Sequence, residues 1–267
     1  MHIVVCVKQV PNPDTPASQF RIDEAARRVE AIGGVPLIMS PFDEQAVEVA
    51  LRLREAQPGI RITVLTLGPD GARNVLKHGL AMGADDGVLL NDSAFAGADS
   101  YATAVTLAAA IRKIGAVDLV LAGRQAADDD NGVVGTGIGE LLGMAVICFA
   151  KEVSIRDAMI RVERVLDDGT ETIEATLPAV VSVSNEIGEA RKPSLRETMR
   201  AARKPITQWG AADVSIAVDT AGAAGARCSV ERVYAPVKEN RCELIAGETP
   251  GEQAAALVQR LRSAKLI

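Results

Sequence analysis

Short runs of aliphatic and β-branched residues alternate with longer Ala- and Leu-rich segments along the first half of the chain. The apolar runs predict strands at residues 3–10, 61–68, 87–92 and 118–123. Apolar residues at three- and four-residue spacing predict amphipathic helices at residues 43–56, 71–83 and 100–115. Continuous apolar character is typical of strands that are buried on both faces. The alternation therefore predicts an α/β fold with a Rossmann-like, doubly wound, mostly parallel sheet.

The pattern changes after Cys148, where the strands become shorter and more polar. Residues 151–177 predict a meander with two tight turns, and residues 178–186 predict one more apolar core strand. The rest of the chain is rich first in Pro, Lys and Arg and then in Ala and Gly, and it ends in a short helix. Because such a tail buries little surface by itself, we expect an α/β domain at 1–186 and an extended C-terminal arm at 187–267.

Composition narrows the function classes. The 267 residues are 48% hydrophobic, enough for a sizeable core, and the net charge of −6 argues against binding to nucleic acid. The four cysteines show no CxxC spacing and only two histidines are present, so we expect neither zinc nor an iron–sulfur cluster. No apolar run approaches the roughly 18 residues of a membrane span, and no signal peptide precedes the first strand. We therefore expect a cytoplasmic protein without direct membrane insertion.

A glycine-rich stretch at residues 121–143 follows a predicted strand and opens a helix, the junction where open α/β sheets bind ligands. Gly132, Gly135, Gly137 and Gly139 would let the backbone approach a phosphate, and free N–H groups at the helix start would supply donors. The spacing matches neither GxGxxG nor GxxxxGKS/T. The same glycines are therefore also compatible with a tight turn and close helix packing.

Three adjacent aspartates, Asp128, Asp129 and Asp130, lie in this stretch. Adjacent carboxylates point in different directions, so we expect them to cap a helix and set a turn rather than to bind a metal. A catalytic triad has little support because neither histidine has a nucleophile near it in sequence.

Two further loops are predicted at the same edge of the sheet. Three prolines fix the path of residues 8–16 beyond the first strand, and Ser40-Pro41-Phe42-Asp43 starts the next helix with Ser40 as a candidate cap. Three loops that converge on one edge predict a pocket.

The basic segment at residues 191–204 allows two interpretations. Such runs are usually solvated, charged helices. Leu195 and Met199, however, are four residues apart and would share one helix face. An apolar anchor surrounded by charge is a means of docking a protein partner.

Seven motifs, in the same order along the chain, resemble those of electron transfer flavoprotein β subunits. They are VVCVKQVP, SPFDEQAVEVALRLRE, TLGP, LAMGAD, GRQAADDD, LPAVVSV and PSLRETMRAARKPI. The resemblance covers nearly the whole chain and is weakest at 207–250. It implies an adenine-nucleotide alpha-hydrolase-like fold and a heterodimer whose FAD lies mainly on the alpha subunit, against which residues 187–267 would pack.

The resemblance also implies that this chain holds an adenine nucleotide, normally AMP, as a buried structural element. The family's nucleotide contacts correspond here to Cys6, Ser40, Pro41, Phe42, Asp43, Leu67, Gly123, Arg124, Gln125, Ala126, Asp128, Asp129, Asp130, Asn131, Gly132, Val133 and Val134. The family's docking loop, whose leucine enters a hydrophobic pocket of partner dehydrogenases, corresponds to Pro193, Ser194, Leu195 and Met199.

The resemblance implies an electron-carrier subunit that is not itself an enzyme, with a bifurcating, NADH-linked activity as the alternative within the family. The carrier would take electrons from flavin dehydrogenases such as acyl-CoA dehydrogenases, in fatty acid oxidation, and pass them to a quinone oxidoreductase. The alternative from another class is a stand-alone adenine-nucleotide sensor or ATP-using enzyme, against which the missing P-loop argues.

The identity of the nucleotide is open. Many AMP-binding relatives have Asn-Gln-Thr where this chain has Gly132-Val133-Val134, which lacks side chains to bond a terminal phosphate. Electron-bifurcating relatives, which hold a second FAD here, carry a motif like DGDTAQVG, and Asp129 replaces a glycine of that motif. Residues 95–103 are closer to the bifurcating type, and the docking motif is closer to the ordinary type. Since a carboxylate at 129 disfavours a second diphosphate, we expect AMP, with a second FAD as the alternative.

Overall fold

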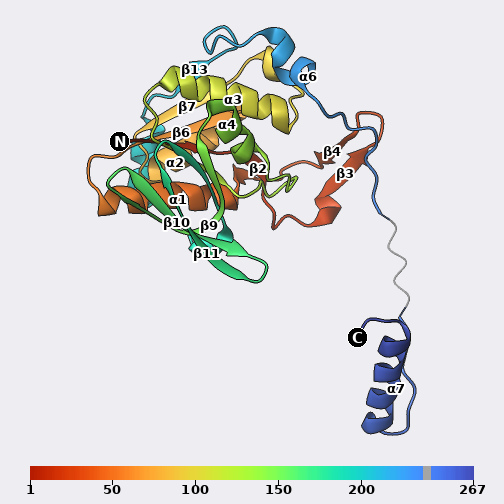
Figure 1. Ribbon diagram of the computed structural model, residues 1–267. Helices are drawn as coiled ribbons and strands as arrows, with labels where there is room; N and C mark the ends of the chain where they lie inside the picture. The colour runs from red at the N-terminus through yellow and green to blue at the C-terminus, as the bar shows by residue number, and fades with distance from the viewer. Residues whose placement is uncertain (237–241) are drawn as a thin grey trace.

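The computed structural model describes residues 1–236 and 242–267, and its centre is a nine-stranded sheet (Figure 1). In the order in which they lie in the sheet, the strands are β11 (Gly169–Thr176), β10 (Met159–Leu166), β9 (Ala145–Arg156), β12 (Ala179–Val183), β8 (Leu119–Gly123), β1 (His2–Cys6), β6 (Arg61–Leu67), β7 (Asp86–Leu90) and β13 (Thr207–Trp209). The α-helices are α1 (Pro41–Ala56), α2 (Arg73–Met82), α3 (Ser100–Ile114), α4 (Val134–Leu142), α5 (Leu195–Ala202), α6 (Gly222–Gly225) and α7 (Pro250–Ser263).

The sheet is parallel from β9 across to β13, and the antiparallel strands β10 and β11 extend it at one edge. The buried residues form two clusters, one on each face. Helices α1, α2 and α5 contribute to one cluster, and α3 and α4 contribute to the other. The predicted doubly wound, mostly parallel α/β fold is confirmed.

The direction of winding reverses beside β1. The chain runs from β1 to β6 and β7 on one side, and then crosses back to β8 on the other side of β1. The two strands are in register, with Ile3 opposite Leu119 and Val5 opposite Leu121, so their carboxyl ends lie at the same edge. In open α/β sheets this reversal leaves a crevice where ligands bind.

Two small antiparallel sheets of two strands each lie beside the main sheet. They pair β2 (Gln9–Pro11) with β5 (Leu37–Met39), and β3 (Phe20–Asp23) with β4 (Arg28–Ala31). The single strand predicted at 3–10 is therefore wrong at its end, because β1 stops at Cys6 and the chain turns away into β2. The β3–β4 hairpin projects from the body in Figure 1.

The C-terminal third is divided between the α/β body and an extended part. Strand β13 pairs with β7, α5 packs on α2, and Ala211, Val214 and Ala221 are buried in the core. The structure thus places residues up to about 221 in the body, since β13 completes one edge of the sheet, and the extended arm starts later than 187. Helix α7 stands apart from the body in Figure 1 and has no buried residue.

Candidate functional site

A cavity of about 780 Å³ lies at the carboxyl edge of the sheet, where β1 and β8 end. Its wall is mainly apolar, with a few polar groups from the β1 end, the glycine-rich loop and the start of α3. The residues that line it are Cys6, Val7, Lys8, Asp43, Leu67, Ala98, Asp99, Ser100, Tyr101, Thr103, Leu107, Ala122, Gly123, Gln125, Ala126, Asp129, Asn131, Gly132, Val133, Val134, Gly135, Arg227, Cys228, Ser229 and Val230. An apolar cleft with a few placed polar groups is the usual form of a small-molecule site.

Asp43 ties three elements together at the base of the cavity. It lies in the first turn of α1, and its carboxylate oxygens accept the backbone N–H of Lys8 at 2.7 Å and that of Gly123 at 3.0 Å. Burial raises the pKa of Asp43 to about 7, although both N–H donors act to lower it. The carboxyl group therefore titrates near neutral pH.

Cys6 ends β1 and is buried beside this carboxyl group. Burial, and then the charge of Asp43, raise the pKa of the Cys6 thiol to about 12. A thiol that stays protonated is neither a nucleophile nor a metal ligand. Cys6 is therefore a packing group in the cavity wall.

Some glycines of the loop lie where the backbone could approach a phosphate, and others permit close helix packing. Gly132 has φ +65° and, with Gly135, lines the cavity. A Cβ on Gly139 would lie 2.2 Å from the Val146 Cγ2, and one on Gly137 would lie 3.0 Å from the Ala104 Cβ, so these two permit close packing of α4 instead.

Helix α4 starts at the cavity without a side-chain cap. Its N-cap is Val133, which supplies no cap hydrogen bond, and Val134 and Gly135 of the first turn line the cavity. The first N–H groups of a helix have no intrahelical acceptor and attract anions. The prediction that an aspartate caps this helix is therefore wrong, and the uncapped N–H groups at the start of α4 lie at the cavity.

The three aspartates set the turn before α4, as predicted, and pair with Lys8. The Lys8 Nζ lies 2.7 Å from Asp128 Oδ1 and 3.1 Å from Asp129 Oδ2, and Asp130 accepts a hydrogen bond from Gln125. Burial acts to lower the pKa of Lys8, but the two carboxylates raise it. Among residues 1–236 and 242–267, no cluster of three or more His, Cys, Asp or Glu side chains is arranged to hold a metal ion.

The cavity brings together most of the residues predicted to contact a nucleotide. Those that line it are Cys6, Asp43, Leu67, Gly123, Gln125, Ala126, Asp129, Asn131, Gly132, Val133 and Val134. Ser40, Pro41, Phe42, Arg124, Asp128 and Asp130 lie outside its lining.

Two residues outside the lining, Ser40 and Arg124, differ in the partners of their side chains. Ser40 occupies the N-cap position of α1, but its buried Oγ makes no cap hydrogen bond and has no partner, so the predicted cap is wrong in its bonding. The Arg124 Cζ lies 6.0 Å from the centroid of the Phe42 ring and 5.4 Å from that of the Phe149 ring. Its guanidinium also donates to the side-chain oxygens of Ser184 and Asn185, both at 3.3 Å.

A segment of the C-terminal part, Arg227–Val230, covers one side of the cavity; we call it the strap. The Asp99 carboxylate accepts the backbone N–H groups of Arg227 at 2.7 Å and of Cys228 at 2.8 Å. The guanidinium of Arg227 lies 3.5 Å from the Tyr101 ring centroid and donates to its hydroxyl group at 2.7 Å. No local sequence pattern predicts the strap, because its partners are more than 120 residues away in the chain.

The predicted docking residues lie away from the cavity, at the start of α5. Ser194 caps this helix through a capping box with Glu197. Leu195 is 78% exposed and Met199 is 58% exposed, and Pro193 precedes the cap. The helix is present as predicted, and its docking role stays a prediction.

Comparison with known proteins gives a consistent family. The model of the electron transfer flavoprotein domain matches residues 31–214. The chain is 39% identical to the caffeyl-CoA reductase–Etf complex subunit CarD of Acetobacterium woodii, with all of both chains covered. It is 35% identical to the electron transfer flavoprotein subunit beta of Megasphaera elsdenii, again over all of both chains. It is 38% identical to the protein FixA of Azorhizobium caulinodans, over 88% of this chain and 85% of FixA.

Proposed function

Because the chain belongs to the electron transfer flavoprotein family, we propose that it is the β subunit of a heterodimeric electron carrier that holds an adenine nucleotide in the cavity beside β1 and β8. The observation that carries this proposal is the cavity itself. It combines an apolar wall with uncapped helix N–H groups and a lysine, at the switch point of the sheet.

The lining fits such a nucleotide. Apolar residues such as Leu67 and Leu107 would contact the base, and the backbone of Gly132 to Gly135 at the start of α4 would hold the phosphates. Lys8 would add a positive charge at the same end, although its pairing with Asp128 and Asp129 already offsets part of that charge.

The cavity also bears on which nucleotide is held. The expectation of AMP depends on a repulsive Asp129, but this carboxylate is paired with the Lys8 ammonium at 3.1 Å. A volume of about 780 Å³ lies in the upper part of the range of roughly 300–1,000 Å³ for ligand clefts. The strap and Tyr101 supply the additional wall. The geometry therefore favours the alternative, a second FAD, over AMP.

The chain has the features of a carrier rather than of an enzyme that breaks substrate bonds. Bound FAD supplies the electron-accepting chemistry, and this chain's residues hold and orient the nucleotide. Cys6 is protonated and no triad is assembled around the cavity lining. We propose an alpha-subunit partner, flavin dehydrogenases such as acyl-CoA dehydrogenases as donors, and a quinone oxidoreductase as acceptor.

Cofactor counting tests the proposal. The chain is co-expressed with its alpha subunit, and the heterodimer is purified, reconstituted with FAD and denatured to release its nucleotides. Two FADs per heterodimer support the proposal in its favoured form, and one FAD with one AMP supports the form expected from sequence. A colourless heterodimer that takes up no flavin would refute the proposed function.

A further inference from the structure

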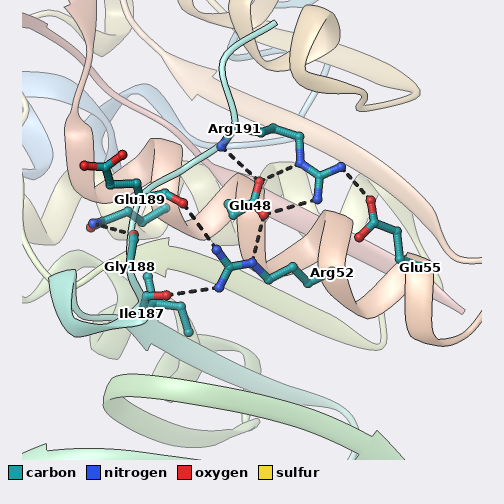
Figure 2. Close-up of polar contacts among 8 residues, drawn as sticks. Glu48, Arg52, Glu55, Ile187, Gly188, Glu189 and Arg191 are labelled. Carbon is teal, nitrogen blue, oxygen red and sulfur yellow. Dashed lines mark hydrogen bonds and ion pairs between the residues drawn. The ribbon is translucent and has the colours of Figure 1, made fainter.

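A buried carboxylate on α1 holds the segment that leads into α5, the helix that carries the predicted docking residues, which we call the docking helix (Figure 2). The Glu48 side chain is only 6% exposed, and its Oε2 accepts the backbone N–H of Arg191 at 3.2 Å and the Arg191 Nε at 2.7 Å. Its Oε1 accepts the Arg191 Nη2 at 3.1 Å and the Arg52 Nε at 2.8 Å. Both carboxylate oxygens of Glu48 are thus fully engaged by the two arginines.

The same arginines bind backbone groups of the segment and a second carboxylate. Arg52 donates to the carbonyl oxygens of Ile187 at 3.0 Å and Glu189 at 3.2 Å, and Arg191 donates to Glu55 at 2.6 Å. Figure 2 shows these contacts joining the segment to one side of α1. Residues 188–194 form no helix or strand, so their backbone groups lack the hydrogen-bond partners of a regular element. Side chains of α1 supply such partners instead.

The other end of the docking helix is held from α2. The Lys77 ammonium donates to the carbonyl oxygens of Ala201 at 3.2 Å and Ala202 at 3.0 Å, and it also contacts the carbonyl of Lys204. A cation at the C-terminal carbonyls matches the helix dipole. Ala201 is buried against the body, so this end is fixed by packing as well.

Between these two contacts the helix presents its apolar side chains to solvent. An eight-residue helix is too short to be stable alone, so its form here depends on the body and on its capping box. Leu195 and Met199 are nevertheless exposed on this fixed helix. Ordering an anchor before binding lowers the free energy lost when a partner immobilises it.

We propose that Glu48 and Lys77 are positioning residues that hold α5 in place, so that Leu195 and Met199 are presented to a flavin dehydrogenase. The inference rests on the proposed carrier function. The competing explanation is purely structural, since a buried ion pair is often replaceable by apolar groups without loss of stability. The two explanations differ in whether docking changes when the fold does not.

The test measures electron transfer from an acyl-CoA dehydrogenase that reduces the wild-type heterodimer, with the heterodimer as the varied substrate. Leu195→Ala establishes whether the anchor is used. Glu48→Gln and Lys77→Met should each raise KM about threefold to tenfold and leave kcat unchanged, because an unfixed helix must be ordered on binding. Glu171→Gln removes an exposed ion pair with Arg164, at 2.7 Å, and serves as the matched control with unchanged KM.

Two further measurements separate positioning from folding. Hydrogen exchange should show faster exchange of residues 187–202 in Glu48→Gln, with unchanged exchange in β1 and β8. In the Leu195→Ala/Met199→Ala background, Glu48→Gln should add nothing to KM, since it acts through these two anchor residues.

The possible failures are distinguishable. If Leu195→Ala raises KM but neither Glu48→Gln nor Lys77→Met does, despite faster exchange in 187–202, the positioning inference is overturned and the docking function stands. If Leu195→Ala itself leaves KM unchanged, the docking role fails and the inference falls with it. Lys77 lies on α2 and Glu48 lies on α1. If one of the two variants fails to fold, the other still tests the positioning inference.

Discussion

The Asp99 carboxylate accepts a hydrogen bond from the backbone N–H of Arg227 at 2.7 Å, and this contact closes one side of the cavity. The other oxygen of Asp99 accepts the Ala102 N–H at 2.8 Å and caps α3. One carboxylate thus joins a helix start to the strap. Asp99 therefore couples the wall of the cavity to the path of the C-terminal segment.

Asp99→Ala should release the nucleotide faster, by about tenfold, because the strap loses two hydrogen bonds that hold it over the cavity. The off-rate is measured by displacement with excess free nucleotide. Asp92→Ala is the control, since Asp92 also caps a short helix and binds the Ala211 N–H, but it does not line the cavity. Both variants should lose about 1 kcal/mol of stability from the cap. Equal off-rates in the two variants would contradict the role of the strap.

Gly123→Ala should abolish close packing between β8 and α1. An added Cβ would lie 2.6 Å from the Phe42 Cβ and 2.7 Å from the Asp43 Oδ1. We expect a loss of about 1–3 kcal/mol in the free energy of unfolding and reduced nucleotide content. Gly169→Ala, which meets nothing within 4 Å, should change stability by less than about 0.5 kcal/mol. Thermal denaturation and nucleotide analysis of the purified proteins check both.

Asp43 should make stability depend on pH in the neutral range. Its pKa is raised from 3.8 to about 7, so between these values the folded protein holds a proton that the unfolded chain has released. The contribution of protonated Asp43 to the free energy of unfolding is complete below pH 3.8 and is lost as the pH rises to about 7. The free energy of unfolding falls by at most about 1.4 kcal/mol per pH unit in this range.

Comparison with Asp43→Asn isolates this effect. The variant cannot ionise, so the wild type should lose stability relative to it between pH 5 and 7, and the difference should stay constant from pH 7 to 9. Denaturant unfolding at several pH values measures this difference. A difference that is flat from pH 5 to 9 would show that Asp43 remains ionised throughout.

Docking through α5 should weaken as salt rises. Arg196, Arg200 and Arg203 are exposed around the apolar anchor, and rim charges act mainly on the rate of association. The double variant Arg196→Gln/Arg200→Gln should show slower association with the dehydrogenase and a shallower dependence on ionic strength. Arg161→Gln, an exposed arginine on β10, should behave like the wild type. Association rates at 20 to 300 mM salt, by stopped flow, provide the check.

The sequence alone determined the architecture and most of the cavity. Continuous apolar runs and helical spacing are local signals, so the parallel sheet and its helices follow from them. The rule that ligands bind at the carboxyl edge then selected Asp43 and the glycine-rich loop. The signal for helix α5, which carries the predicted docking residues, was equally local, because the spacing of Leu195 and Met199 lies within about one turn.

Only the tertiary structure decided how these parts are held. Glu48 lies in an amphipathic pattern that gives no hint of burial, and its partner Arg191 is 143 residues away. The strap reaches Asp99 across a similar separation, and Lys8 meets Asp128 only because β1 and β8 are neighbours. Such contacts depend on the path of the whole chain, whereas hydrophobic periodicity records only which side of each element is buried.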